Sequence, residues 1–510
     1  MNQKLVINIS PTEKRIALLE NNQVAEILIE REEQRTSVGN IYRGVVSRVL
    51  PGMNCAFVKI GLERAAFLYG RDVLDPAMPL DSELEAEAFL GEELPLVSRS
   101  PQKPIDELLH EGHYIVVQVL KEPLGTKGPR ISMNLSLPGR YLVLLPHVSH
   151  LGISRRIESE SERKRLRETV QPLLPTQMGV IVRTAAQDVK EEDLRQDLLY
   201  LLKAWHTLEE KISTPPDSTA KSIGLLYAEL PIHLRVVRDW YSTHVSEIVV
   251  DSRKTYKELQ QFLLDTLPGA VDKLRLHKDP IPVFDLYDIE LDLAGALDRK
   301  VMLPSGGHLI VDQTEALTSF DVNTGKFVGT SNARETIFKT NLEAAKKVAE
   351  QLRLRNIGGI IIIDFIDCET DEDRETLFAQ FQQELKRDRA RTHVLRISEL
   401  GLVQMTRKRT ADSLGRQLLQ ECPYCMGNGQ VRRLETEGTD LLREIRRISL
   451  QTGEKNVTIH AREDLIHWVE THERDALLTL QEKQGLHIRF VPSAFKLEMV
   501  RDSQYEVIVS

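Results

Sequence analysis

The stretch Gly358-Gly359-Ile360-Ile361-Ile362-Ile363-Asp364-Phe365 decides the fold of the central part of this chain. Its four isoleucines predict a β-strand buried on both faces, because β-branched side chains suit a pleated sheet and leave no polar face for water. An earlier run, Ala316-Leu317-Thr318-Ser319-Phe320-Asp321-Val322-Asn323, predicts a second strand. Between the two, apolar residues recur at helical spacing from about residue 331 to residue 352. Strand, helix and strand in this order predict a parallel pair joined by a crossover helix.

Each of these two strands brings an aspartate to its end, and together they predict a metal site. Parallel strands end at the same edge of a sheet, so Asp321 and Asp364 should lie close together, with the amide of Asn323 beside them. A poorly solvated carboxylate needs a proton, a charged partner or a cation, and hard oxygen ligands suit Mg²⁺ or Mn²⁺. The alternative is that each acid caps a helix or pairs with a basic side chain. On spacing alone both interpretations stay open.

Length and composition indicate a multidomain globular protein. The chain has 510 residues, 41% of them hydrophobic and 28% charged, which is enough for three or four domains with separate cores. The N-terminus alternates like a strand and has no signal-peptide core. Since no apolar stretch approaches the roughly 20 residues of a membrane span, we expect a cytoplasmic protein.

The charge distribution predicts local contact with a polyanion. A net charge of −9 argues against indiscriminate binding to nucleic acid. Two basic clusters nevertheless follow the second acidic strand, at residues 386–391 and 407–409. Basic patches around a metal site are what handling of a polyanion would require. The alternative is that these residues form solvated helix faces.

The motif Cys422-Pro423-Tyr424-Cys425 admits two interpretations. It is similar to the redox motif of glutaredoxin-like proteins, in which the first thiol is activated at a helix N-terminus. Here Gly427 and Gly429 follow, which suit a tight turn, and two thiolates so spaced can share one tetrahedral Zn²⁺. Because the sequence has no second such pair, a second copy of the chain would supply the other two ligands, which predicts a zinc-linked homodimer. A thiol oxidoreductase is the alternative.

Residues 39–68 predict a small β-barrel of five strands. They form short strands at close spacing with glycines at the corners, and a final strand follows at residues 114–119. Phe57 and Phe67 lie near strand ends, with Lys59 and Arg64 close in sequence. Aromatic rings beside basic groups suit the stacking of single-stranded bases and contact with phosphates. The alternative is that both phenylalanine rings lie in the core of the barrel.

Taken together, these stretches resemble the bacterial ribonuclease E/G family of endoribonucleases. The matching stretches follow one another in the family's order from about residue 1 to residue 430. They include Gly39–Gly44, Ala65–Leu68, Gly152–Glu158, Val182–Ala185, Leu303–Gly307, Asn341–Ala345, Gln351–Arg355, Ile363–Asp367, Asp388–Arg391 and the Cys-Pro-Tyr-Cys turn.

The resemblance implies a multidomain α/β (α+β) fold in which an S1 (OB-fold) barrel is inserted in an RNase H-like domain. A DNase I-like catalytic domain, a zinc-link and a small α/β domain then follow. The implied boundaries are 1–36 and 221–296 for the RNase H-like structural domain, 37–132 for the S1 RNA-binding domain, 133–220 for a 5′-phosphate sensor domain, 297–418 for the catalytic domain, 419–432 for the zinc-link and 433–510 for the small C-terminal assembly domain.

The resemblance also implies roles for particular residues. The Mg²⁺ site would consist of two ligands and a neighbouring amide that orients them: Asp321, Asp364 and Asn323. The residues that hold RNA on the barrel would be Phe57, Phe67 and Lys127. A 5′-monophosphate would be recognised by Arg183 and Thr184, surrounded by Val143, Arg155 and Arg391. The Zn²⁺ shared between subunits would be held by Cys422 and Cys425.

The activity implied is that of a Mg²⁺-dependent endoribonuclease that cleaves single-stranded RNA and is stimulated by a 5′-monophosphate. It would leave 5′-phosphate and 3′-hydroxyl ends and act in rRNA and tRNA processing and in mRNA decay, on rRNA precursors and mRNA. The assembly implied is a homodimer through the zinc-link, or a homotetramer. The alternative function is that of a non-catalytic RNA-binding or chaperone protein with the same barrel and structural acids, which would bind RNA without magnesium-dependent cleavage.

Overall fold

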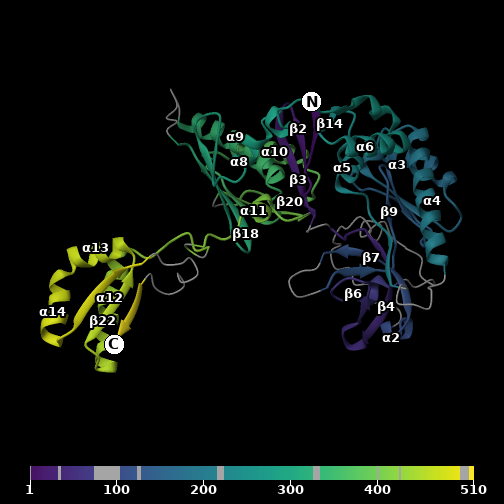
Figure 1. Ribbon diagram of the computed structural model, residues 1–510. Coiled ribbons are helices and arrows are strands. Elements are labelled where there is room, and N and C mark those ends of the chain that lie inside the picture. Colours follow the sequence, from purple (N-terminus) through teal and green to yellow (C-terminus); the bar gives the residue numbers. More distant parts are fainter. Residues whose placement is uncertain are drawn as a thin grey trace. The chain divides into compact units, whose positions relative to one another are not determined.

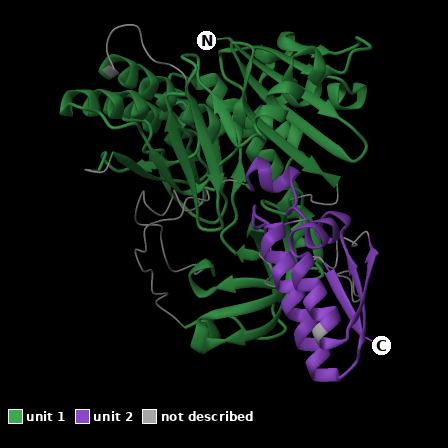
Figure 2. Ribbon diagram, turned by 90° about the vertical axis from the view of Figure 1, so that its left-hand side faces the viewer, with its two compact units in different colours: residues 1–411 green, residues 412–510 purple. Residues whose placement is uncertain are grey.

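The computed structural model describes residues 2–32, 36–73, 104–122, 128–214, 223–325, 333–398, 401–409, 411–423, 425, 427–493 and 505–509. The chain divides into two compact units, residues 1–411 and 412–510, which Figure 2 distinguishes by colour. Within the described residues, the first unit contains four β-sheets and the second contains one; Figure 1 labels some of their elements. No helix in these ranges is both long and apolar enough to cross a bilayer.

The first sheet joins the N-terminus to a segment more than two hundred residues later. Its order is β15–β14–β1–β2–β3, with β14 and β15 parallel to β1 and the hairpins β1–β2 and β2–β3 antiparallel. The apolar sides of α5 and α6 pack against it and build one core. The elements of this part are β1 (Gln3–Ile9), β2 (Glu13–Glu20), β3 (Gln23–Arg31), α5 (Ile232–Trp240), β14 (Val245–Val250), α6 (Arg253–Thr266), β15 (Leu274–Leu276), α7 (Val283–Leu286) and α8 (Ile289–Gly295).

The predicted barrel is confirmed. Strands β4, β5, β6, β8 and β7 pair in that order, and β7 pairs back to β4, so the sheet closes; β13 adds to β4 on the outside. Closure leaves no free strand edge within the barrel. Its elements are β4 (Ile41–Leu50), β5 (Cys55–Lys59), β6 (Ala66–Tyr69), α2 (Ile105–Leu108), β7 (Tyr114–Lys121), β8 (Arg130–Ser132) and β13 (Gly224–Tyr227).

A four-stranded sheet in the order β11–β12–β10–β9 follows the barrel in sequence. All four residues of β12 are buried, as expected for the continuous apolar run Gly179-Val180-Ile181-Val182. Two helices cover this sheet and share its core. The elements are β9 (Leu137–Pro138), β10 (Leu142–Leu145), β11 (Leu151–Ile153), α3 (Glu160–Val170), β12 (Gly179–Val182) and α4 (Glu191–Ser213).

The central six-stranded sheet confirms the predicted strand–helix–strand unit. Its order is β16–β17–β18–β19–β21–β20; β18 and β19 are parallel, and the other pairs are antiparallel. The crossover helix is α9, and α9 and α10 pack side by side on one face of the sheet. The elements are β16 (Lys300–Met302), β17 (His308–Gln313), β18 (Leu317–Asn323), α9 (Ala333–Leu354), β19 (Gly359–Asp364), α10 (Asp371–Leu385), β20 (Thr392–Val394) and β21 (Leu402–Arg407).

The prediction that the isoleucine strand is buried on both faces is wrong. Ile361 and Ile363 are fully buried under α9 and α10, but Ile360 is 52% exposed and Ile362 is half-buried. Side chains alternate along a strand, and here a single crossover supplies helices to one face of a mostly antiparallel sheet. The other face, which we call the open face, is uncovered by the helices of this core.

An ion-pair cluster ties the central sheet's helix α9 to the N-terminal sheet. Arg353, only 7% exposed at its side chain, lies 2.8 Å from a carboxylate oxygen of Glu20 and 2.8 Å from one of Glu26. Burial lowers the pKa of this arginine, but the two carboxylates more than offset burial and raise it overall. A buried charge of this kind is tolerated only when partners surround it, so this cluster fixes α9 against the N-terminal sheet.

The second unit is a small α/β domain, as expected for the region beyond residue 431. Strand β22 lies between β23, to which it is parallel, and β24, to which it is antiparallel. Three helices pack with these strands around one apolar core. The elements are α11 (Leu414–Leu418), α12 (Leu434–Thr452), β22 (Asn456–Ala461), α13 (Glu463–His472), α14 (Arg474–Gln484), β23 (His487–Pro492) and β24 (Tyr505–Val509).

Candidate active site and RNA-binding surfaces

The two predicted acids face each other across neighbouring strands. The register of β18 and β19 pairs Asp321 directly with Asp364. Both side chains are exposed on the open face, while Phe320 and Ile363, one residue before each, are fully buried. Paired strands lie about 4.8 Å apart, so the two carboxylates occupy adjacent positions at the strand ends. Residues 43 positions apart in sequence therefore form one polar site.

The amide of Asn323 orients one of these acids. Its Nδ2 donates a hydrogen bond of 2.8 Å to Oδ2 of Asp321. Asn323 follows Asp321 by two residues on the same strand, so both side chains lie on the same face. His308, on β17, pairs with Asn323 in the strand register and lies at the margin of the site. Sequence reasoning did not single out this histidine, because its position depends on the pairing of β17 with β18.

The electrostatics of the site favour a cation. Burial raises the pKa of Asp364, and the negative charges of Asp321 and Asp367 raise it further. Asp367, three residues after Asp364, lies close enough to act on its carboxylate. A cation would relieve this repulsion, and carboxylate and amide oxygens are ligands that Mg²⁺ accepts. The residues present therefore fit the metal that the resemblance implies.

Two carboxylates provide only part of a metal coordination shell. Across the described ranges, no group of three or more histidine, cysteine, aspartate or glutamate side chains could hold a metal. Mg²⁺ usually keeps several waters and is bound by one or two carboxylates together with substrate phosphates. The pair Asp321 and Asp364 matches that pattern of binding.

The prediction that both basic clusters contact a polyanion is wrong for Arg407, which is buried. Arg407 is 5% exposed, and its guanidinium donates to both oxygens of Asp388, at 2.6 and 3.0 Å. Arg389 donates to the carbonyl oxygen of Trp240 at 3.2 Å and stacks over that ring at 5.2 Å. A buried guanidinium needs such a partner, so Arg407 is structural. The side chain of Arg389, in contrast, is 36% exposed. Arg391 is exposed.

The barrel carries a row of aromatic rings. Phe57 and Phe67 are paired across β5 and β6, with ring centroids 5.5 Å apart, and both are half-buried. Tyr69, which sequence reasoning missed, extends the row at 4.5 Å from Phe67 and is 38% exposed. The signal was available, since Phe67 and Tyr69 alternate along one strand and share a face. Arg130 lies over the Tyr69 ring at 4.9 Å. Lys127 lies outside the described residues.

The arginine predicted to read a 5′-phosphate follows β12 directly. The backbone N–H of Arg183 donates to the carbonyl of Tyr141 at 2.8 Å. Its Nη1 donates to the carbonyl of Gly139 at 2.6 Å and lies 2.8 Å from Oδ1 of Asp239. Thr184 is exposed, and its hydroxyl shares a hydrogen bond of 3.0 Å with that of Ser154. A guanidinium and a hydroxyl are thus presented together by rigid elements.

The other residues expected around this phosphate site differ in accessibility. Arg155 and Arg391 are exposed. The side chain of Val143 is only 2% exposed and packs with Leu145 and Ile181, so it does not face a ligand. Its position on β10 makes it part of the core that supports β12.

The cysteine pair lies in a turn that suits metal ligation. Cys422 is exposed and Cys425 is half-buried; Tyr424 lies outside the described residues. The Sγ of Cys425 accepts the backbone N–H of Gly429 at 3.3 Å, and Gly427 and Gly429 have φ of 81° and 69°. The nearest following helix, α12, begins only at Leu434. The thiols are therefore not at a helix N-terminus, where redox cysteines are activated.

Comparison with known proteins gives strong likenesses over most of the chain. A family model described as "Ribonuclease E/G family" matches residues 136–410, and one described as "RNase E/G, Thioredoxin-like domain" matches residues 421–506. Ribonuclease G of Salmonella typhimurium (strain SL1344) is 43% identical over 489 residues, 96% of each chain. Ribonuclease G of Escherichia coli (strain K12) is 46% identical over 448 residues, 88% of each chain. Ribonuclease E of Nostoc sp. is 39% identical over 435 residues, 83% of this chain and 60% of that protein.

Proposed function

The chain belongs to the ribonuclease E/G family, and we propose that it is a cytoplasmic, Mg²⁺-dependent endoribonuclease that cleaves single-stranded RNA. A 5′-monophosphate on the substrate stimulates it, and its products carry 5′-phosphate and 3′-hydroxyl ends. Its substrates are rRNA and tRNA precursors and mRNA. The observation that carries this proposal is the pairing of Asp321 with Asp364 on the open face.

In this proposal the catalytic domain is a DNase I-like fold built on the central sheet. Asp321 and Asp364 would hold the metal, and Asn323 keeps Asp321 oriented by donating to its Oδ2. When bound, Mg²⁺ supplies the positive charge that polarises the scissile phosphate and activates a water molecule. The open face leaves both carboxylates accessible to an extended RNA strand, since α9 and α10 cover only the opposite face.

One experiment tests the proposed function as a whole. The purified protein is incubated with a single-stranded RNA carrying a 5′-monophosphate, with and without Mg²⁺, and the product ends are identified. Cleavage that requires Mg²⁺ and leaves 5′-phosphate and 3′-hydroxyl ends is expected. Binding without cleavage under either condition would instead support a non-catalytic RNA-binding protein.

The aromatic row on the barrel is proposed to stack RNA bases. Replacing Phe67 with leucine keeps an apolar side chain but removes the ring, so RNA affinity should fall about tenfold, because stacking of one base contributes ~1–3 kcal/mol. Fluorescence anisotropy with a labelled single-stranded RNA measures the change.

The matched control for Phe67 is Tyr114→Leu. Tyr114 is 54% exposed and lies on β7, which is not adjacent to β6 in the barrel. Its loss should leave the affinity within about twofold, since the ring lies outside the aromatic row. Equal weakening by both substitutions would show that the row has no special role.

The guanidinium of Arg183 is proposed to bind the 5′-monophosphate, with the hydroxyl of Thr184 beside it. Arg183→Gln should lower kcat/KM for 5′-monophosphorylated RNA about tenfold, because charge-assisted hydrogen bonds to a phosphate contribute ~1.5–3 kcal/mol. Cleavage of the same RNA with a 5′-hydroxyl should be unchanged. Arg195→Gln, at an exposed position of α4, is the control. Equal slowing of both RNAs by Arg183→Gln would contradict the sensor role.

The cysteine turn is proposed to hold half of a Zn²⁺ site that is completed by a second copy of the chain. Two thiolates from each chain would give the four ligands of a structural site. The hydrogen bond from Gly429 to the Sγ of Cys425 supports this assignment, since it stabilises a thiolate within the turn. The resulting assembly is a homodimer, or a homotetramer if the small domain adds a second interface.

A further inference from the structure

A carboxylate that the predicted phosphate site does not include lies directly on its arginine. Oδ1 of Asp239, near the end of α5, lies 2.8 Å from Nη1 of Arg183. The same Nη1 also donates to the carbonyl of Gly139. Within the described residues, neither Nε nor Nη2 of Arg183 has a hydrogen-bond partner. One edge of the guanidinium is therefore held by the protein, and the other remains available to an anion.

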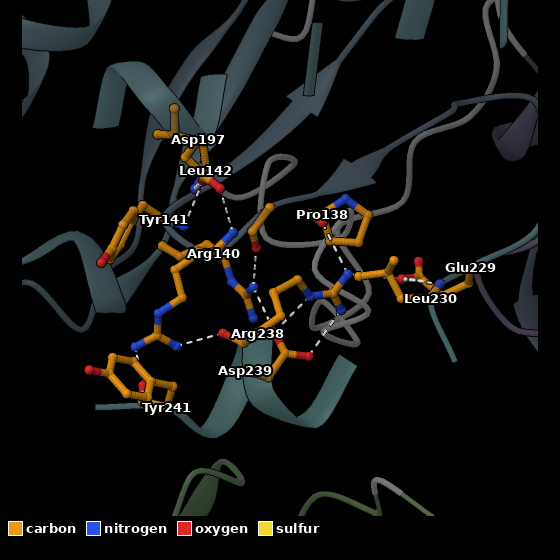
Figure 3. A network of polar contacts seen from close by, with 12 residues as sticks. Pro138, Arg140, Tyr141, Leu142, Asp197, Glu229, Leu230, Arg238, Asp239 and Tyr241 are labelled. Carbon is orange, nitrogen blue, oxygen red and sulfur yellow. Dashed lines mark hydrogen bonds and ion pairs between the residues drawn. The ribbon is translucent and has the colours of Figure 1, made fainter. Parts of the chain in front are cut away.

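The second oxygen of Asp239 is held by another arginine. Arg238 donates from Nη2 to Oδ2 of Asp239 at 3.0 Å and from Nε to Oδ1 at 3.2 Å. Arg238 is 6% exposed and also donates from Nη1 to Glu229 at 2.8 Å and to the carbonyl of Pro138 at 3.0 Å (Figure 3). The carboxylate of Asp239 is thus fixed in orientation, with Oδ1 facing Arg183 and Oδ2 serving Arg238 alone.

The backbone around Asp239 is clamped from two further sides. Arg140 donates from Nη1 to the carbonyl of Arg238 at 2.6 Å and from Nη2 to the carbonyl of Tyr241 (Figure 3). Arg389 donates to the carbonyl of Trp240. The last carbonyls of a helix lack partners within the helix, and here arginines from other segments supply them. The backbone on both sides of Asp239 is therefore held in place.

The turn that holds the same edge of Arg183 is also fixed. Asp197, on α4 and 1% exposed, accepts three successive backbone N–H groups, from Arg140 at 2.9 Å, Tyr141 at 2.7 Å and Leu142 at 2.9 Å (Figure 3). This turn presents the carbonyls of Gly139 and Tyr141 that Arg183 contacts. Two independent elements, the turn and the end of α5, thus immobilise Arg183.

We propose that Asp239 is a positioning residue for 5′-end recognition: it holds Nη1 of Arg183 so that the Nε–Nη2 edge is presented to the phosphate. This inference rests on the proposed function of Arg183. A guanidinium fixed in advance loses less side-chain entropy when it binds a phosphate through two parallel hydrogen bonds. Asp239 therefore increases the preference for monophosphorylated ends although it never touches the RNA.

The charge state of Asp239 agrees with this role. Burial raises its pKa, but the positive charges of Arg238 and Arg183 more than offset burial and bring the pKa to about 2. The carboxylate is thus ionised at every pH at which RNA is handled, and it accepts hydrogen bonds without donating any.

The test compares kcat/KM for one RNA with a 5′-monophosphate and with a 5′-hydroxyl, and reports the ratio of the two. Asp239→Ala should lower this ratio about tenfold, because Arg183 loses the hydrogen bond that fixes its orientation. Asp239→Asn should keep the ratio within about threefold of the original, since Oδ1 can still accept from Arg183 while only the Oδ2 bond to Arg238 is lost. Cleavage of the 5′-hydroxylated RNA should be unchanged in both variants.

The matched control is Glu229→Gln, in the same network. Glu229 contacts Arg238 but not Arg183, so its replacement should leave the ratio unchanged even if it lowers the melting temperature. General damage to folding lowers both rates together and does not move the ratio. An unchanged ratio in Asp239→Ala, or equal losses in the alanine and asparagine variants, would overturn the positioning role. If Arg183→Gln also leaves the ratio unchanged, the sensor assignment itself fails; if it lowers the ratio, only the role of Asp239 is excluded.

Discussion

Replacing Asp321 or Asp364 with asparagine is expected to lower kcat about a thousandfold or more, and to leave RNA affinity within about twofold of the original. Asparagine keeps the shape of the side chain but removes the charge that would hold Mg²⁺ opposite the scissile phosphate. The barrel, whose aromatic row is the proposed binding surface, is a separate sheet and should be unaffected. Single-turnover cleavage and anisotropy on the same RNA measure the two quantities.

Asp312→Asn is the matched control for these substitutions. Asp312 lies on β17 in the same sheet, but its carboxylate pairs with Arg299 at 2.5 and 2.7 Å. Exposed ion pairs contribute only ~0.2–1 kcal/mol, so this variant should cleave at close to the original rate. Loss of RNA binding in parallel with loss of cleavage in Asp321→Asn would count against a metal-binding role. An equal loss of cleavage in Asp312→Asn would show that the effect is not specific to Asp321 and Asp364.

Removing Zn²⁺ by chelation, or replacing Cys422 with serine, is expected to dissociate the assembly to subunits of half the mass or less. Binding of a structural zinc contributes on the order of 10 kcal/mol to the stability of the site. Because the proposed site is shared, Cys422→Ser removes one ligand from each of the two chains. Light scattering coupled to size exclusion measures the mass, and atomic emission measures the zinc content. The proposed catalytic residues Asp321 and Asp364 lie in the other unit, so the Cys422→Ser substitution does not alter them.

Cys368→Ser is the control for the zinc prediction. Cys368 is half-buried in the first unit, where its thiol lies 3.5 Å from Nδ2 of Asn341, and it is far in sequence from the cysteine turn. This variant should keep both its mass and its zinc. The thiol oxidoreductase interpretation would be favoured by three results together. The wild-type protein would contain no zinc, its mass in solution would not change on chelation, and it would catalyse thiol–disulfide exchange.

The isoleucine strand illustrates how far pattern reasoning reached. The alternation of apolar runs and a helical spacing predicted the parallel pair β18–β19 and its crossover α9, because these depend on local preference and chain connectivity. Burial of the second face was mispredicted, since Ile360 has the same local sequence signal as Ile361 but faces a side that no helix of this core covers. Which face is covered depends on where distant helices pack.

The basic clusters show that a count of charges does not reveal which arginines are paired inside the fold. Arg389, Arg391 and Arg407 are equivalent in a charge count, yet Arg391 is exposed, Arg389 is half-buried and Arg407 is buried. Asp388 forms an ion pair with Arg407. Arg389 donates a hydrogen bond to the carbonyl oxygen of Trp240, which lies almost 150 residues earlier in the chain. No local pattern reports such pairings, because the cost of burying a charge is offset by a partner whose position the fold determines.

The sequence by itself determined the family, the closed barrel, the strand–helix–strand unit and the identity of the paired acids, because short-range periodicity and the chemistry of particular residue types are written along the chain. Only the tertiary structure decided that Asp321 and Asp364 share one register position, that Tyr69 extends the aromatic row, and that Asp239 holds Arg183. These depend on the registration of one strand or helix against another. This alignment is set by the packing of side chains that are far apart in sequence, so the local sequence around each residue does not reveal it.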